Sequence, residues 1–482
     1  MRAVRTLRAA AVAVVLAVVA VAARADCNAI IRPISEPNQF PNRVAGPFAT
    51  NGSVVMVAKL DNANSQRAIY VSTYDEPSLG PLTFDRQIVP TSLNGPIALL
   101  RGVTDFALFY QRNDFNIVMQ RLSDQGEPIG NPIVLAPSQA FTQQEIEVIY
   151  DPFRRAYVMI RTVPQQGLWL TIINTDGSLA MNQQVSPFIG TPTSPRVAAM
   201  PNGTLGIVWV MTTPVVDQLH FMAIRPDNSL IFSSVQPISP RGRMPLIAAN
   251  ASTFLIITRH ETVTGESTLH SIRMSPAGTF LERETPFLAP HGLDIASTAL
   301  VWNPDLAEWA MAYVDYSGAS GTGYAESRLL RFTDDGRPRS DSVFAPELAS
   351  GFLLQLVDEL VWSNEGYLGT GEFTLVPVQG SASSLMRHCP LLAHPRPVLR
   401  NQLLGSTVTF SAFATGGIPN HDFRWDFGDF SGVVTGSTVS HRFQRTGVHT
   451  ITVTVTDRGG STNQQSFQVN IVEPRRRPSR KR

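Results

Sequence analysis

The chain has 482 residues, and its 39 Lys and Arg residues nearly balance its 38 Asp and Glu residues, for a formal charge of +1. Hydrophobic residues make up 43% and charged residues 16%, which excludes a disordered protein, and two cysteines are too few for a small disulfide scaffold. The near-neutral total gives no reason to expect a nucleic-acid partner, and the length allows two or three domains.

Residues 1–25 have the organisation of a secretory signal peptide. Three arginines precede an uncharged run at 9–23 that holds only Ala, Val and Leu, and Ala23-Arg24-Ala25 then provides a small-x-small cleavage pattern. The run is shorter than the ~20 residues that a membrane-spanning helix needs. We therefore predict cleavage before Asp26 and export to the periplasm, the cell envelope or the medium. An uncleaved membrane anchor is the alternative.

Residues 45–392 repeat a pattern of four short strands about every fifty residues. A turn follows each third strand, and glycine or asparagine there tolerates the positive φ that a tight hairpin requires. Four strands per repeat and no long amphipathic helix predict an all-β fold with a seven-bladed β-propeller, whereas a long β-sandwich or a β-solenoid is the alternative. The turns are centred on Gly80, Gly126, Gly177, Asn228, Gly278 and Gly336.

The last repeat lacks a fourth strand, and the N-terminus offers one. Residues 27–37 copy the proline-containing ending of the other fourth strands, so we predict that they complete the last blade and remove its exposed edge. Cys27 and Cys389 would then lie at neighbouring ends of antiparallel strands, within reach of a disulfide. The predicted propeller domain spans 26–394 and is closed by this strand and the Cys27–Cys389 bond. Two unpaired thiols are the alternative.

A second domain is predicted over residues 395–472, after a stiff proline-containing linker at 394–397. Within these roughly 80 residues, apolar residues alternate with polar ones in four segments, which is typical of a small β-sandwich. The motif Trp425-Asp426-Phe427-Gly428-Asp429, with the segment 441–457 that follows it, resembles the PKD (polycystic kidney disease) domain, an immunoglobulin-like sandwich. The resemblance implies a spacer or interaction module of exported and cell-surface proteins.

The chemistry of this motif favours a structural turn. Trp425 and Phe427 are expected to point inward, while Asp426 and Asp429 bracket a turn that Gly428 permits and accept backbone hydrogen bonds. Calcium binding by the two aspartates is the alternative, although a Ca²⁺ site takes about six or more oxygens. We predict no cofactor and no metal. The sequence departs from the family at Phe430, where Gly is frequent, and at Val448, where an aromatic residue is common.

No established catalytic motif is present. The chain has no HExxH, no P-loop, no GxGxxG after a strand and no GxSxG, and its nine histidines form no ligand pair at a useful spacing. Carboxylates that face one another across the channel could act as an acid and a base, or hold a cation. Solvated charges at strand ends are the simpler interpretation. The candidates in or beside first strands are Glu145, Glu147, Asp294, Asp358 and Glu359.

The last ten residues, 473–482, form a basic tail that we expect to be disordered. It is suited to contact an anionic surface, or serves only solubility. The leader contributes +4 and residues 475–482 contribute +6, which leaves −9 on residues 26–474. We predict a monomeric exported protein that binds a glycan or an extracellular protein, as in adhesion at the cell envelope. The alternative is a secreted polysaccharide hydrolase or lyase with Glu145, Asp294 or Asp358 at the channel mouth.

Overall fold

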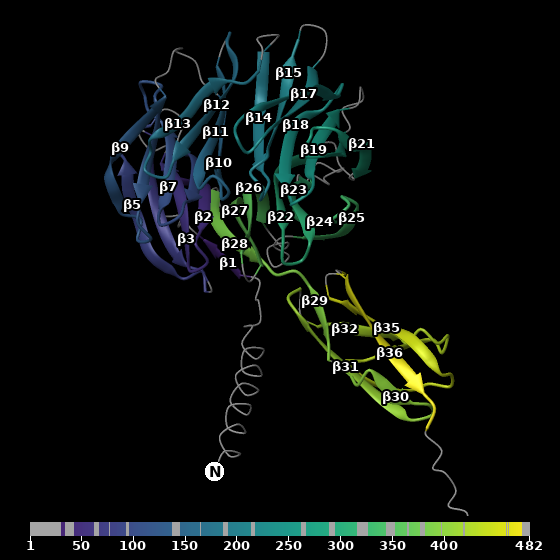
Figure 1. Ribbon diagram of the computed structural model, residues 1–482. Coiled ribbons are helices and arrows are strands. Elements are labelled where there is room, and N and C mark those ends of the chain that lie inside the picture. The colour runs from purple at the N-terminus through teal and green to yellow at the C-terminus, as the bar shows by residue number, and fades with distance from the viewer. Residues whose placement is uncertain are drawn as a thin grey trace, which may run out of the picture. The chain divides into compact units, whose positions relative to one another are not determined.

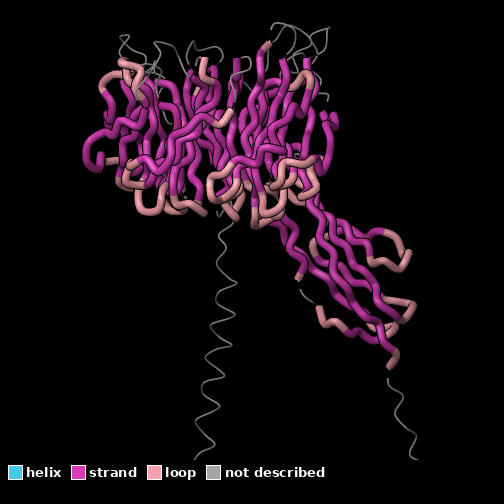
Figure 2. Tube along the Cα trace, turned by 45° about the horizontal axis from the view of Figure 1, so that its top comes forward, coloured by secondary structure: helices cyan, strands magenta, loops and turns pink. Residues whose placement is uncertain are grey.

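The computed structural model describes residues 30–33, 43–61, 67–76, 78–92, 96–136, 145–163, 165–186, 191–213, 217–261, 267–288, 295–315, 326–343, 352–363, 366–375, 381–396, 398–417, 420–458, 460 and 462–474. The predicted signal peptide, Cys27, Asp294 and the run of basic residues in the tail lie outside this part. The described residues form strands, turns and loops without any helix (Figure 2). Accordingly, no helix among them is long and apolar enough to span a bilayer.

The chain divides into two compact units, Ile30–Arg387 and a second unit that holds His388–Arg482. Within the described residues, the first unit contains seven four-stranded sheets, which we number one to seven in chain order (Figure 1). Sheets one to four are β2 (Arg43–Thr50), β3 (Val54–Asp61), β4 (Ala68–Asp75) and β5 (Pro81–Val89); β6 (Pro96–Arg101), β7 (Phe106–Gln111), β8 (Ile117–Leu122) and β9 (Pro128–Ala136); β10 (Ile146–Asp151), β11 (Ala156–Val163), β12 (Gly167–Asn174) and β13 (Leu179–Gln184); and β14 (Thr191–Ala199), β15 (Leu205–Thr212), β16 (Asp217–Ile224) and β17 (Leu230–Ser239). Sheets five to seven are β18 (Arg243–Ala249), β19 (Phe254–Glu261), β20 (Ser267–Met274) and β21 (Phe280–Leu288); β22 (Ile295–Asn303), β23 (Glu308–Asp315), β24 (Glu326–Thr333) and β25 (Pro338–Val343); and β26 (Phe352–Ser363), β27 (Gly366–Leu375), β28 (Ser381–His388) and β1 (Ile30–Pro33).

The first strands of these sheets follow one another in a circle. Each first strand, from β2 to β26, contacts the first strand of the next sheet, and β26 in turn contacts β2. Sheets one and seven also share a hydrophobic cluster, in which Val57 and Tyr74 of sheet one pack with Leu368 of sheet seven. Antiparallel four-stranded sheets arranged radially in this way are the architecture of a β-propeller.

Strand β1 supplies the outermost strand of sheet seven, although it comes from the other end of the chain. It pairs antiparallel with β28, and Ile30 lies opposite Arg387. Cys389 follows β28 directly and is buried. Because Cys27 lies outside the described residues, the disulfide to Cys389 stays a prediction.

The middle strands are buried on both faces, whereas the outermost strands are largely exposed. All six residues of β7 (FALFYQ) are buried, and five of the six residues of β13 (LAMNQQ) are exposed. A strand that neighbouring sheets cover on both faces is expected to read as an unbroken apolar run. This is why second strands are conspicuous in the sequence and fourth strands are not.

The turns after the third strands match the sequence pattern in five sheets, but not in sheet one. Gly126, Gly177, Asn228, Gly278 and Gly336 all have positive φ. In sheet one the turn closes at Gly80 as predicted, but the positive φ belongs to Leu79 (50°), so the prediction of a positive φ at Gly80 was wrong. In the loop there, Ser78 Oγ donates a hydrogen bond to Asp75 Oδ2 at 2.6 Å and accepts one from the Gly80 amide at 3.0 Å.

The second unit is a β-sandwich of a three-stranded and a five-stranded sheet. The sheets bury one cluster between them, in which Phe410, Trp425, Phe427 and Ile451 are fully covered. In pairing order, the sheets are β29 (Leu392–Pro395), β31 (Thr407–Thr415) and β34 (Thr438–Arg442), and β30 (Asn401–Leu403), β36 (Thr462–Val472), β35 (Gly447–Thr456), β32 (Asp422–Asp426) and β33 (Val433–Thr435).

The linker predicted at 394–397 is in part the first strand of this sandwich. His394 lies in β29, where its ring stacks on Phe413 with centroids 4.9 Å apart and its Nε2 lies 2.8 Å from Thr415 Oγ1. Pro395 is tolerated because β29 is an edge strand that pairs only with β31. The sandwich therefore begins before residue 395.

Gly278 tests how tightly successive sheets pack. Its φ is +77°, and a Cβ at this position would lie 2.1 Å from Ser234 Cβ on β17 of the preceding sheet. We expect Gly278→Ala to lower the unfolding free energy by about 2–3 kcal/mol, because it adds a clash to a φ penalty of ~1 kcal/mol. Urea denaturation measures the change. The matched control is Gly130→Ala, where φ is +68° and nothing lies within 4 Å, and where we expect only the ~1 kcal/mol of φ strain. Equal losses in the two variants would contradict tight packing between the sheets.

Candidate functional site

The first strands of the propeller enclose a cavity of about 570 Å³. All seven of these strands contribute to its wall, and most of the lining side chains are apolar, among them Phe48, Ile97 and Leu300. The charged residues of the described lining are Arg101, Glu147 and Arg196, so Glu147 is its single carboxylate.

Glu147 joins two neighbouring first strands. It lies on β10, and its carboxylate accepts a hydrogen bond from the Val197 amide on β14 and lies 3.9 Å from Arg196 Nε. The adjacent Glu145 carboxylate accepts from the Ser194 amide on the same strand. An innermost strand pairs with only one neighbour, so part of its amide groups point to the channel and need acceptors. The two glutamates satisfy two of these amides, next to a bulge in β14 between Thr193 and Arg196.

The surroundings of Glu147 make it titrate near neutrality. Burial raises the pKa of Glu147 to about 7, against the lowering effects of the Arg196 charge and the Val197 amide. Burial dominates because a carboxylate loses hydration that one distant guanidinium does not replace.

The structure brings together only part of the predicted carboxylate group. Glu145 is exposed beside β10, at the start of the strand that carries Glu147. Asp358 and Glu359 fall in β26 at an irregularity of the register between Val357 and Leu360. The side chains of these two residues are not described, and Asp294 lies outside the described residues. Among the predicted carboxylates, the side chains of Glu145 and Glu147 are described. Both belong to the segment at the start of β10, so they do not face each other across the channel.

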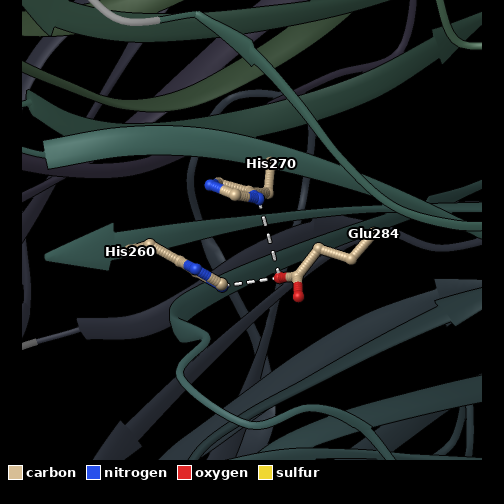
Figure 3. A group of neighbouring side chains, drawn as sticks. All are labelled: His260, His270 and Glu284. Carbon is tan, nitrogen blue, oxygen red and sulfur yellow. Dashed lines mark ion pairs between the residues drawn. The ribbon is translucent and has the colours of Figure 1, made fainter. Parts of the chain in front are cut away.

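A second group of polar side chains lies in sheet five. His260 on β19 and His270 on β20 stack with ring centroids 3.9 Å apart and an interplanar angle of 17°. Glu284 on β21 places its Oε1 2.5 Å from His260 Nε2 and 3.9 Å from His270 Nδ1 (Figure 3). The three side chains are 15–19% exposed. The prediction that the histidines form no ligand pair was wrong, because His260 and His270 form such a pair.

Strand register explains how residues so far apart in sequence meet. His260 lies opposite Thr268 across the β19–β20 hairpin, which places His270 two residues further along on the same face. A register shift in β21 leaves Arg283 and Glu284 together opposite one residue of β20. Two histidines at nearly equal distances from a hairpin loop are the signal that would have revealed the pair.

Neighbouring hydroxyl groups hold both imidazoles. His260 Nε2 lies 3.1 Å from Ser239 Oγ at the end of β17, and His270 Nε2 lies 3.0 Å from Thr268 Oγ1. Burial, followed by the positive charge on His260, lowers the pKa of His270. Burial alone would raise the pKa of Glu284, but the hydrogen bonds from His260 and Ser239 and the charges of the two imidazoles outweigh it, and the pKa is lowered.

In the sandwich, the aspartates of the motif are used within the turn. Asp426 Oδ1 accepts a hydrogen bond from the Gly428 amide at 2.8 Å, and Asp429 Oδ1 accepts from the Ser431 amide at 3.1 Å. Asp429 Oδ2 also lies 2.7 Å from His441 Nε2. Trp425 and Phe427 are fully buried, as an inward-facing pair requires.

The two departures from the family motif both lie on the surface. Phe430 has a φ of 67° and is 98% exposed, which explains why glycine is frequent at this position. Val448 is 63% exposed, so it has no place in the core.

Comparison with known proteins identifies the sandwich. Residues 398–471 match the PKD domain family. This segment is a PKD domain. No curated protein matches the chain.

Several solved structures resemble the chain weakly. The β-propeller domain of the Trilobed protease from Pyrococcus furiosus is 7% identical, with a TM-score of 0.45 over 71% of this chain and 95% of that chain. The SapL1 lectin, in complex with α-methyl fucoside, is 12% identical, with a TM-score of 0.36 over 63% and 95%. The α-L-arabinofuranosidase from Lactobacillus brevis is 11% identical, with a TM-score of 0.31 over 48% and 89%.

Phe430 predicts a stabilising substitution in the PKD domain. We expect Phe430→Gly to slow amide exchange in β35 and β36 by an amount equal to about 0.5–1 kcal/mol, because glycine takes a positive φ without steric cost. Hydrogen-exchange mass spectrometry on the full chain measures this. Phe430→Ala removes the same aromatic ring but keeps the φ penalty, so it should give no such gain. A gain of the same size from alanine would assign the effect to the exposed ring.

Glu147 predicts a pH-dependent stability. The folded-state pKa lies above the ordinary value of 4.5, so folding favours the protonated form, and this contribution is present below pH 4.5 and lost as the pH rises through 7. The Gln side chain of Glu147→Gln stays neutral, so this variant should not lose stability as the pH rises. The difference between its unfolding free energy and that of the parent should increase by about 1–3 kcal/mol between pH 4.5 and 8. Urea denaturation across this range measures the difference. Glu127→Gln, at a carboxylate that is 60% exposed, is the control and should run parallel to the parent. A parallel profile for Glu147→Gln would refute the shift.

Proposed function

We propose that this chain is an exported binding protein, which recognises a glycan or a protein segment at the central cavity of a seven-bladed propeller. The PKD domain serves as a spacer or interaction module of the same chain. The composition of the cavity wall is the observation that carries this proposal.

The cavity has the character of a ligand pocket. Its volume of about 570 Å³ falls in the range of ~300–1,000 Å³ that is typical of small-molecule sites. Most of its lining residues are apolar, but polar atoms make up about half of its accessible surface, so a ligand there would meet both apolar contacts and hydrogen-bonding groups. A single sugar or two, or one or two side chains of a peptide, would fill it.

Arg196 is the polar group best suited to contact the ligand. Its side chain is 39% exposed, its Nη1 donates to the Pro195 carbonyl at 3.2 Å and its Nε lies 3.9 Å from Glu147, which leaves further N–H groups of the guanidinium for a ligand. Arg101 is less suited, because its Nη1 already donates to Asp124 Oδ1 at 2.6 Å. A guanidinium at the cavity wall favours a ligand that carries a carboxylate or several hydroxyl groups.

Hydrolysis is the second candidate, and Glu147 is the observation that favours it. A carboxyl group with a pKa of about 7 has the acidity expected of a general acid at neutral pH. Glycosidases generally pair such an acid with a second carboxylate ~5–10 Å away. Among the described lining residues Glu147 is the single carboxylate, so binding is the better supported function.

The proposal includes three features outside the described residues. The leader at 1–25 is cleaved before Asp26, and the basic tail contacts anionic surfaces. The Cys27–Cys389 disulfide ties the N-terminal strand to sheet seven. The pairing of Ile30 with Arg387 supports this bond, since it brings the preceding and following chain segments to the same end of the sheet.

A glycan and peptide array, run together with a polysaccharide-degradation assay, tests the proposed function. We expect the purified chain to bind a defined ligand without releasing products, and Arg196→Ala to weaken that binding at least tenfold. Arg86→Ala is the control. Arg86 lies on the outer strand β5, where it pairs with Glu127, so this variant should leave binding unchanged. Product release that Glu147→Gln abolishes would replace the binding proposal with the hydrolase.

A further inference from the structure

We propose that His260, His270 and Glu284 bind one divalent transition-metal ion of the zinc type within sheet five. This site is separate from the central cavity, and it does not depend on the proposed ligand-binding function.

The donor set suits such an ion. Two imidazoles and one carboxylate are a ligand set that zinc uses in sites that keep a fourth position open for water or a ligand. Hard cations such as Ca²⁺ and Mg²⁺ prefer an all-oxygen set, which two nitrogens do not provide. The chemistry of the side chains therefore selects a borderline-soft ion.

The geometry is close to what coordination needs. The three ligand atoms all lie within 4.8 Å of one another. Tetrahedral coordination with bonds of ~2.0–2.1 Å places ligand atoms about 3.4 Å apart. Glu284 Oε1 lies 2.5 Å from His260 Nε2 and 3.9 Å from His270 Nδ1, on either side of this value. Shifts of about 1 Å in the side chains would bring the atoms to bonding positions.

Two buried atoms of the group, His270 Nδ1 and Glu284 Oε1, have no hydrogen-bond partner among the described residues, although Glu284 Oε1 forms an ion pair with His260. His270 Nδ1 is covered from solvent, and its nearest charged atom is Glu284 Oε1 at 3.9 Å. A buried polar atom without a partner needs an explanation, and an ion that binds there supplies one. The stacked imidazoles are also aligned with their edges toward the same carboxylate (Figure 3).

The surrounding hydroxyl groups orient the imidazoles. Thr268 Oγ1 lies 3.0 Å from His270 Nε2 and can accept a hydrogen bond from an Nε2–H group. In this tautomer the lone pair of the ring is on Nδ1, the atom that faces Glu284. Partners of this kind fix the tautomer and the ring orientation of histidines that bind metals. Ser239, from the preceding sheet, lies 3.1 Å from His260 Nε2, the same atom that faces Glu284, so an ion that binds this nitrogen replaces the Ser239 contact.

Calorimetric titration of the full chain, stripped with a chelator and free of any histidine tag, tests the site. We expect one Zn²⁺ per chain with micromolar or tighter affinity, one Co²⁺ with visible absorption bands of a four- or five-coordinate ion, and no stoichiometric Ca²⁺. His270→Gln and Glu284→Gln should each weaken Zn²⁺ binding at least 100-fold. His220→Gln is the matched control, because His220 stacks on Trp209 in sheet four and should leave the affinity unchanged.

Thermal unfolding without metal shows whether each variant folds. Should the ligand variants unfold, Thr268→Val keeps all three ligands and removes one hydroxyl, and it should weaken Zn²⁺ binding by about 10–100-fold. Absence of stoichiometric binding to the parent chain would overturn the proposal. So would an affinity that none of the three substitutions changes. Either result would make the cluster a hydrogen-bonded polar group within the sheet.

Discussion

The propeller depends on one constraint, namely that each four-stranded sheet must bury both of its faces against its neighbours. The clusters of buried residues span successive sheets, as where Met56 of sheet one packs with Phe106 of sheet two, and Val158 of sheet three with Trp209 of sheet four. An open array would expose one apolar face at each end. The shared cluster of sheets one and seven buries both of these faces, and the pairing of β1 with β28 covers the open edge of sheet seven.

Glu308 shows how a buried charge is accommodated between two sheets. Glu308 of sheet six is fully covered, and it accepts hydrogen bonds from Arg331 at 2.6 and 2.8 Å and from the Tyr367 hydroxyl of sheet seven at 2.8 Å. An unpaired carboxylate at this depth would cost several kcal/mol. Asn303 Nδ2 also donates to the Tyr367 hydroxyl at 3.0 Å, so the network joins sheets six and seven through several polar contacts.

The same constraint decides where chemistry can occur. Innermost strands have one unpaired edge, and at β14 the carboxylates of Glu145 and Glu147 satisfy amides of that edge. Burial at the channel wall then raises the pKa of Glu147. In sheet five the outer strand β21 is irregular, and the irregularity allows Glu284 to approach two histidines of the regular hairpin beside it. In both places a departure from regular pairing positions the reactive side chains.

Local patterns were sufficient to predict the strands, the turns with positive φ at Gly126, Gly177, Asn228, Gly278 and Gly336, and the PKD domain around Trp425, because each depends on residues close in the chain. The turn at Gly80, the extent of β29 and the partners of Glu147 required the tertiary structure. The cluster of His260, His270 and Glu284 required it most. The alternation of apolar and polar residues indicates which side chains share a face of a strand. A register shift of one residue decides which side chains of neighbouring strands come into contact. Such shifts arise from packing between sheets, and no short stretch of sequence records them.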